Sequence, residues 1–218
     1  MQSTGPAAAP RASTGESHQA PGPYDAGVDT NPAEPEIRTL GSSVVYTDPW
    51  IRLRKDDIER GDGSRGTYAV VERDDFALIV PAASDGFHLV EEYRYPVARR
   101  SWSFPQGAFP HGETGTPEEL ARMELAQETG LRAGKMRHLG KLTAAHGMSS
   151  QRCDYFLATH LTPGPPDPEP EEFGIRAAWF PREEFEEMTR DGRITDDSTL
   201  AAYALFLLAE RRGDLPPL

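Results

Sequence analysis

Residues 101–131 read SWSFPQGAFPHGETGTPEELARMELAQETGL, which predicts a strand, a glycine-rich loop and a helix. Thr116 suits the N-cap position, Pro117 suits the first helical position, and Glu119 completes a capping box with Thr116. Gly130 suits the left-handed conformation that commonly ends a helix. The sequence therefore predicts a helix that lies between Thr116 and Gly130, and the other elements are interpreted around it.

Two carboxylates in this helix are placed for metal chemistry. Glu124 and Glu128 are four residues apart, so both side chains leave one face, and Gln127 lies close to that face. Glu113 lies in the glycine-rich loop before the helix. Carboxylates beside a tight loop suit a hard cation such as Mg²⁺, which usually binds together with substrate phosphates. The alternative is a solvated amphipathic helix, because Glu is common on helix surfaces.

The spacing of Gly107, Glu113, Glu124, Glu128 and Gly130 closely resembles the Nudix box. In that family the box reads G-x5-E-x7-R-E-U-x-E-E-x-G-U, where U is an aliphatic residue. Leu131 fills the last position of this pattern.

The chain departs from the box at three points. The interval between Glu113 and the position of the Arg-Glu pair is two residues longer, which implies a longer loop before the helix. Met123 stands where the family has Arg, with Arg122 adjacent, and Gln127 stands where the family has a Glu. In the family the Arg holds the metal-binding carboxylates in place. Arg122 is a candidate to compensate, although it points about 100° away on an ideal helix.

A segment before the box resembles the ADP-ribose pyrophosphatases within this family. Residues 93–97 (YRYPV) and the pattern Phe104-Pro105-x-Gly107 match that subfamily, with Ser103 in place of the usual Glu and Gln106 in place of a frequent Ala. The hairpin predicted for residues 44–72 also looks like its N-terminal β-unit. The resemblance covers about residues 42–210.

The resemblance implies the Nudix fold, of the α/β (α+β) class: a mixed β-sheet sandwiched between helices, with an N-terminal antiparallel β-unit. Residues 1–35 are rich in Pro, Ala, Gly and Ser and have few large aliphatic residues, so we expect a disordered tail. We expect residues 36–213 to form the Nudix hydrolase domain, with the β-unit at 36–75 and the box region at 101–131. Apolar runs and turn signals predict strands at 67–72, 76–80, 87–95, 135–143, 153–159 and 175–180, and helices at 182–190 and 198–212.

Composition excludes several classes of protein. The net charge of −12 argues against a nucleic-acid-binding surface, which needs a basic patch. The single cysteine, Cys153, excludes an internal disulfide, fits a reducing compartment and is expected to be inert. No apolar run approaches the roughly 18 residues of a membrane span, and the N-terminus does not resemble a signal peptide. We therefore expect a cytoplasmic protein without a membrane or nucleic-acid partner.

The resemblance also implies roles for particular residues. Glu124 and Glu128 would bind Mg²⁺, or Mn²⁺ in its place, and the backbone carbonyl of Gln106 would complete the metal site. Related pyrophosphatases carry the catalytic base on the loop before the last strand, and counting back from residues 175–176 places Glu171 or Glu172 there. Glu128 would share in catalysis through the metal. The alternative for this loop, which is rich in Pro and acidic residues, is a plain exposed connection.

Four further residues are candidates for substrate binding. Arg94 would contact a phosphate or the adenosine end, the alternative being a surface salt bridge. Trp50 and Tyr95 would stack on a base or ribose, although aromatic residues in such strands are more often core. Met148 belongs to residues 147–150, which resemble a substrate-side loop of the family. The neighbouring His146 is either a ligand or catalytic base, or simply a loop histidine near the pocket mouth.

The implied activity is metal-dependent hydrolysis of the diphosphate bond of a nucleoside diphosphate linked to another moiety. ADP-ribose, giving AMP and ribose 5-phosphate, is the first candidate, and related ADP-sugars come next. The resemblance also implies a homodimer in which the N-terminal strands contact the partner. The alternative function is a catalytically weak or inactive Nudix domain that acts as a nucleotide-ligand sensor or interaction module. Met123 and Gln127 in the altered box favour that alternative.

Overall fold

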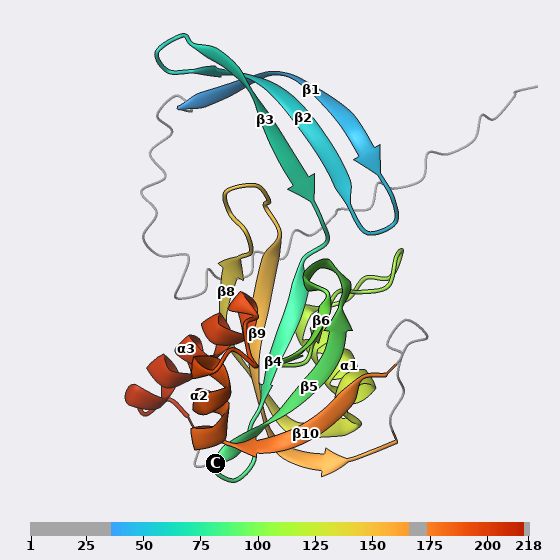
Figure 1. Cartoon of the computed structure of the whole chain (residues 1–218), viewed down its shortest axis with the longest axis vertical. Helices are drawn as coiled ribbons and strands as arrows, with labels where there is room; N and C mark the ends of the chain where they lie inside the picture. Colours follow the sequence, from blue (N-terminus) through green and yellow to red (C-terminus); the bar gives the residue numbers. More distant parts are fainter. Residues whose placement is uncertain (1–35, 166–173, 216–218) are drawn as a thin grey trace, which may run out of the picture. The chain divides into compact units, whose positions relative to one another are not determined.

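A computed structural model of the chain describes residues 36–165 and 174–215 (Figure 1). The chain divides into two units, Met1–Ala33 and Glu34–Leu218, and the fold described below belongs to the second. The predicted disordered tail, residues 1–35, lies outside the described residues. None of the helices in the described ranges is long and apolar enough to cross a membrane.

The described chain contains strands and helices in an α+β arrangement. They are β1 (Ile37–Thr47), β2 (Arg52–Arg60), β3 (Arg65–Glu72), β4 (Phe76–Pro81), β5 (Gly86–Arg94), the 3₁₀ helix η1 (Tyr95–Val97), β6 (Arg99–Ser103), β7 (Gln106–Gly107), α1 (Pro117–Thr129), β8 (Leu131–Thr143), β9 (Arg152–Pro163), β10 (Arg176–Pro181), α2 (Arg182–Arg190) and α3 (Asp197–Arg211).

The strands form three sheets. The first is the N-terminal antiparallel unit β1-β2-β3, in which the Asp62-Gly63 turn joins β2 to β3 and Gly63 has a φ of 80°. The second has the order β7-β4-β9-β8 and is mixed, because β4 and β9 are parallel while their outer neighbours are antiparallel. The third has the order β10-β5-β6 and is antiparallel. The mixed sheet and the N-terminal β-unit confirm the predicted fold class.

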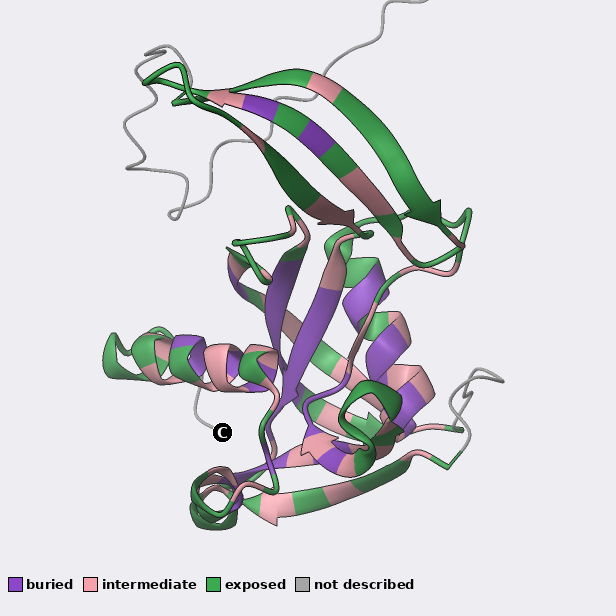
Figure 2. Ribbon diagram, turned by 45° about the horizontal axis from the view of Figure 1, so that its top comes forward, coloured by how far each residue is buried: buried purple, intermediate pink, exposed green. Residues whose placement is uncertain are grey.

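The central strand β4 is buried on both of its faces. Ala77 and Ile79 pack into a cluster with residues of α1, whereas Leu78 and Val80 pack into a second cluster with residues of α2 and α3. Figure 2 shows β4 and its neighbour β9 as largely buried ribbons, and a buried stripe along α1. A strand covered by helices on both faces reads as a continuous apolar run, which explains the sequence FALIV.

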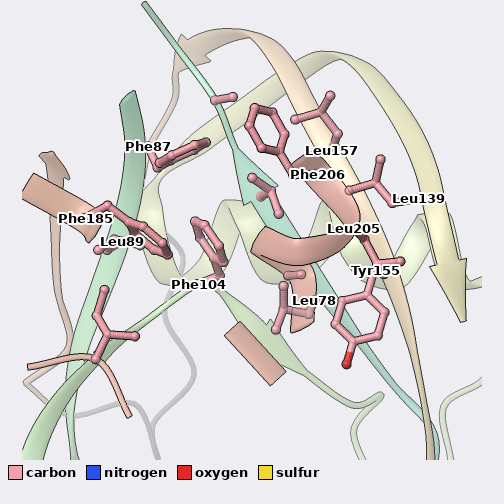
Figure 3. Packing of buried hydrophobic residues seen from close by; sticks show 14 of the residues in the cluster. Leu78, Phe87, Leu89, Phe104, Leu139, Tyr155, Leu157, Phe185, Leu205 and Phe206 are labelled. Carbon is pink, nitrogen blue, oxygen red and sulfur yellow. The ribbon is translucent and has the colours of Figure 1, made fainter. Parts of the chain in front are cut away.

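Aromatic rings fill the centre of the second cluster (Figure 3). The ring of Phe87 makes edge contacts with Phe104, Phe185, Tyr203 and Phe206, at centroid distances between 5.3 and 5.8 Å. Edge-to-face pairs contribute roughly 0.5–1.5 kcal/mol each beyond the area that they bury. Because Phe104 lies two residues before β7, this packing fixes the chain just ahead of the strand.

The ends of two helices are set by side-chain caps. The capping box of α1 is confirmed: Glu119 N donates to Thr116 Oγ1 at 3.2 Å, and Thr116 N donates to Glu119 Oε2 at 2.8 Å. Gly130 ends α1 with a φ of 69°. The predicted start of the last helix at Ser198 is wrong by one residue, because Asp196 caps α3 and the helix begins at Asp197.

Two further details differ from or extend the sequence prediction. The strand predicted at 135–143 begins earlier, at Leu131, because the chain pairs with β9 directly after Gly130 and Leu131 lies opposite Pro163. Cys153 lies fully buried in β9, and burial raises the pKa of its thiol, so the sulfur stays protonated and unreactive at neutral pH.

Candidate active site

Helix α1 buries two carboxylates. The exposed fraction is 5% for Glu124 and 9% for Glu128, and both lie among the buried residues of the helix together with Leu120, Ala121 and Leu125. The alternative of a solvated helix face is therefore wrong for these two residues. Burying a charged carboxylate costs free energy unless hydrogen bonds, an opposite charge or a cation compensate it.

Strand β7 crosses directly over these carboxylates. The backbone N–H of Gln106 donates to Glu128 Oε2 at 3.0 Å. A Cβ placed on Gly107 would lie 2.6 Å from Cδ of Glu124, closer than real Cβ atoms approach other heavy atoms. Only glycine at position 107 therefore allows the strand and the carboxylate to lie this close together.

Two structural elements hold the segment that leads into β7. Ile79 N in β4 donates to Pro105 O at 3.0 Å. From the start of α3, Thr199 Oγ1 accepts a hydrogen bond from Phe104 N at 3.0 Å, and Asp196 Oδ2 accepts one from Gln106 Nε2 at 3.0 Å. Sequence reasoning missed this role of α3. The signal available was the Asp-x-x-Thr pattern at 196–199, which is typical of a helix N-cap.

The donor set fits a divalent metal ion. Mg²⁺ prefers oxygen ligands and is commonly held by one or two carboxylates together with water and substrate phosphates. Glu124 and Glu128 supply two carboxylates, and the chain at Gln106 passes beside them. Within residues 36–165 and 174–215, no group of three or more His, Cys, Asp or Glu side chains gathers as a ligand cluster.

Met123, at a substituted position of the box, and the adjacent Arg122 both make defined contacts in the structure. Met123 packs against the apolar cluster between α1 and the mixed sheet. Arg122 forms an ion pair with Glu118 at 2.8 Å and donates to Ala133 O at 2.9 Å. Its guanidinium is therefore engaged elsewhere, and the idea that Arg122 takes over the family's Arg is wrong.

The two candidate bases, Glu171 and Glu172, lie outside the described residues. The described chain resumes at Gly174, whose carbonyl accepts a hydrogen bond from Arg100 Nη2 at 2.7 Å. Arg100 is itself held by Glu91, through Nε to Oε2 at 2.8 Å and through Nη2 to the backbone carbonyl at 2.9 Å. The segment directly after the candidate bases is thus anchored to β5 and β6.

The candidate aromatic contacts are exposed. Trp50 is 70% exposed in the turn between β1 and β2, and its backbone N–H donates to Asp48 Oδ1 at 2.8 Å. Tyr95 is 85% exposed in η1. The alternative that these rings belong to the core is therefore wrong. Arg94 ends β5 and forms an ion pair with Glu92 at 2.5 Å, as its alternative interpretation expected.

The turn after β8 is tied to the N-terminal sheet. Met148 and His146 are exposed in this turn. Tyr68 Oη in β3 donates to Gly147 O at 2.8 Å, and Val71 N donates to Met148 O at 2.8 Å. Sequence reasoning missed Tyr68, because nothing local marks a contact across 79 residues.

The geometry brings together Gln106, Gly107, Glu124 and Glu128, which all belong to the predicted box region. The NUDIX domain matches residues 72–203, which is more than half of the chain. The chain belongs to the Nudix family. The nucleoside diphosphate sugar hydrolase N-terminal domain matches residues 37–71, the range of β1 to β3. This protein is therefore a Nudix hydrolase of nucleoside diphosphate sugars, and as in Nudix hydrolases generally its chemistry uses a divalent metal ion.

Individual relatives agree with this placement. The ADP-ribose pyrophosphatase of Bacillus subtilis (strain 168) is 25% identical over 128 residues, which cover 58% of this chain and 68% of the relative. The methanol dehydrogenase activator of Bacillus methanolicus is 23% identical over 128 residues, with the same shares. A solved structure described as an ADP compounds hydrolase matches this Nudix hydrolase with a TM-score of 0.71 at 23% identity, over 83% of this chain and 97% of that one. The structural match confirms the fold.

Proposed function

We propose that this Nudix hydrolase cleaves the diphosphate of ADP-ribose to give AMP and ribose 5-phosphate, with related ADP-sugars as the next candidates. The observation that carries the proposal is the buried pair Glu124 and Glu128 directly beneath Gln106 and Gly107. The name of the Bacillus subtilis relative supports the choice of ADP-ribose.

Hydrolysis of a diphosphate needs three things: charge neutralisation, an aligned water, and a group that accepts its proton. A divalent ion, when bound, would supply the positive charge that offsets the charge of the diphosphate and polarises the attacked phosphorus. Glu124, Glu128 and the backbone carbonyl of Gln106 would hold that ion, and we expect Mg²⁺, with Mn²⁺ as a substitute. Glu171 or Glu172 would accept the proton of the attacking water.

Four exposed side chains would contact the substrate. Arg94 would exchange its ion pair with Glu92 for a phosphate, because a guanidinium forms charge-assisted hydrogen bonds with phosphate oxygens as it does with a carboxylate. Trp50 and Tyr95 would stack on the base or ribose, and their exposure leaves their faces accessible. Met148 would pack against the apolar part of the ligand, since its thioether adapts to irregular surfaces.

We also propose a homodimer in which the β1-β2-β3 sheet faces a second copy. Strand β1 is almost wholly exposed (Figure 2), and it is paired on one side, with β2, among the described residues. Large apolar side chains are exposed along it, namely Ile37, Leu40, Val44, Val45 and Tyr46. An exposed apolar edge strand is costly in a monomer, so a partner that covers it is expected. We place the enzyme in the cytoplasm, because its single cysteine suits a reducing compartment.

The test is release of AMP from ADP-ribose in the presence of Mg²⁺ and then Mn²⁺, beside a panel of nucleoside diphosphate sugars. Preferred turnover of ADP-ribose would support the proposal. Preferred turnover of a nucleoside diphosphate sugar with a base other than adenine would overturn the ADP assignment. Glu171→Gln and Glu172→Gln are measured separately, and the variant with the larger fall in kcat would identify the catalytic base. Glu183→Gln, an exposed carboxylate at the start of α2, is the matched control.

One outcome would favour the sensor function instead. If no member of the panel were hydrolysed while ADP-ribose still raised the melting temperature, the protein would bind the nucleotide without turnover.

Light scattering on the purified protein tests the proposed dimer independently of activity, and a mass of one chain would contradict the dimer.

A further inference from the structure

We infer that Asp196, at the start of α3, is a positioning residue for the metal site: it holds the side chain of Gln106, whose backbone in turn holds Glu128. The relevance of this contact to catalysis rests on the proposed function, but the contact itself does not. Gln106 is bound at both ends, through Nε2 to Asp196 Oδ2 at 3.0 Å and through its backbone N–H to Glu128 Oε2 at 3.0 Å.

Asp196 is itself fixed in place by Thr199. The backbone N–H and the hydroxyl of Thr199 both donate to Asp196 Oδ2, at 2.8 and 2.7 Å. A threonine hydroxyl has one hydrogen, so once this is given to Asp196 its oxygen accepts the N–H of Phe104 at 3.0 Å. The direction of every hydrogen bond in this chain of contacts is therefore determined.

The contact between the start of α3 and the chain before β7 is buried. Thr199 is fully buried, and Phe104 is fully buried within the aromatic cluster. The start of α3 therefore holds this part of the chain by two hydrogen bonds, one to the backbone of Phe104 and one to the side chain of Gln106. Hydrogen bonds to a carboxylate are roughly twice as strong as those between neutral groups. Together these bonds fix the direction in which the backbone N–H of Gln106 points toward Glu128 in α1.

This arrangement does more than cap a helix. A cap requires only that an oxygen of Asp196 accepts the N–H of Thr199. The hydrogen bond from Gln106 contributes nothing to the helix and depends on a glutamine at a position where a smaller side chain would not reach. If Asp196 were only a cap, its loss would lower stability and leave the site unchanged.

Two variants separate these roles. Asp196→Ser keeps a good N-cap oxygen but is too short to reach Gln106. Gln106→Ala removes the same hydrogen bond from the other side, keeps the backbone groups of residue 106 and leaves the cap of α3 intact. Asp197→Ser changes an exposed neighbour in the first turn of α3 and is the matched control. If Asp196→Ser folds poorly, Gln106→Ala still tests whether the hydrogen bond between Gln106 and Asp196 supports the metal site.

The first readout is amide hydrogen exchange at Gln106 in the metal-free protein, measured by NMR. We expect the Gln106 amide, which donates to Glu128, to exchange at least about tenfold faster in Asp196→Ser and at the wild-type rate in Asp197→Ser. The second readout is Mn²⁺ affinity by electron paramagnetic resonance. Loss of a partner outside the ligand shell typically costs 10–100-fold, so we expect about tenfold weaker binding in Asp196→Ser and in Gln106→Ala, with no further loss in the double variant.

The outcomes distinguish this inference from the proposed function. Wild-type exchange at Gln106 in Asp196→Ser, together with unchanged Mn²⁺ affinity in Gln106→Ala, would overturn the inference even if the melting temperature fell. If the Gln106 amide exchanged faster in Asp196→Ser but the wild type bound no Mn²⁺ and hydrolysed no nucleotide, the positioning contact would be supported. The metal site and the proposed function would then be overturned.

Discussion

The α-carbon of Gly107 lies against the carboxylate of Glu124, so close that a Cβ at position 107 would come within 2.6 Å of the carboxyl carbon. The two residues come from different elements, β7 and α1. Glu124 is therefore held between the helix that carries it and a strand that has no side chain at that point. This contact explains in physical terms why a glycine belongs at the start of the box.

Gly107→Ala should displace Glu124 and weaken metal binding, because the added methyl group and the carboxylate cannot occupy the same space. We expect Mn²⁺ affinity to fall by at least about tenfold, with a correspondingly lower kcat/KM. Gly61→Ala is the control, since the nearest atom to its added Cβ would lie 3.8 Å away. Equal Mn²⁺ affinities for the two variants would contradict the close approach.

Glu124→Gln and Glu128→Gln should each abolish most of the activity, since a neutral amide is a poor ligand for a hard cation. We expect kcat/KM to fall by at least about 100-fold. Glu118→Gln, on the exposed part of α1, is the control. Unchanged turnover in Glu128→Gln would show that the metal assignment is wrong.

Tyr68→Phe should affect substrate binding more than chemistry, because it removes one of the two hydrogen bonds that tie the turn carrying Met148 to β3. Loss of one hydrogen bond of about 1 kcal/mol predicts a KM increase on the order of fivefold with kcat unchanged. Tyr203→Phe, which loses a hydrogen bond to Glu186 within the helical layer, is the matched control and should leave KM unchanged. A fall in kcat alone would argue against a role of this turn in binding.

Because of Asp154, the free energy of unfolding should depend on pH in the acid range. Burial alone would raise the pKa of Asp154, but hydrogen bonds from His138 and Lys141 outweigh burial and hold the pKa below its usual value. A depressed pKa in the folded state gives stability that is present above the unfolded-state pKa of about 3.9 and is lost as the pH falls through the folded-state value.

The measurement is the free energy of unfolding of the wild type and of Asp154→Asn between pH 7 and pH 2. The wild type should be more stable at neutral pH, and the difference should shrink below about pH 4 as Asp154 is protonated. A difference that stays constant over this range would show that the charge of Asp154 does not contribute.

The sequence alone was sufficient to predict features that depend on neighbouring residues. The capping box of Thr116 and Glu119 and the end of α1 at Gly130 follow from rules that act within one helical turn, and the structure confirms them. The Nudix family also followed from spacing along one short stretch, and the domain match confirms it. The residue roles at the site, including those of Glu171 and Glu172, remain predictions.

The tertiary structure decided what depends on contacts between distant segments. The start of α3 binds Gln106 across 90 residues, and β3 binds Gly147 across 79 residues, and neither pairing leaves a periodic or local signal. The structure also decided that Glu124 and Glu128 are buried rather than solvated, because a helical pattern gives the face of a side chain but not what covers it. The sequence by itself determined which residues share a helix face. Only packing decided that β7 would lie against Glu124 and Glu128 and that the cap of α3 would hold Gln106 of β7, since these elements meet only when the chain folds.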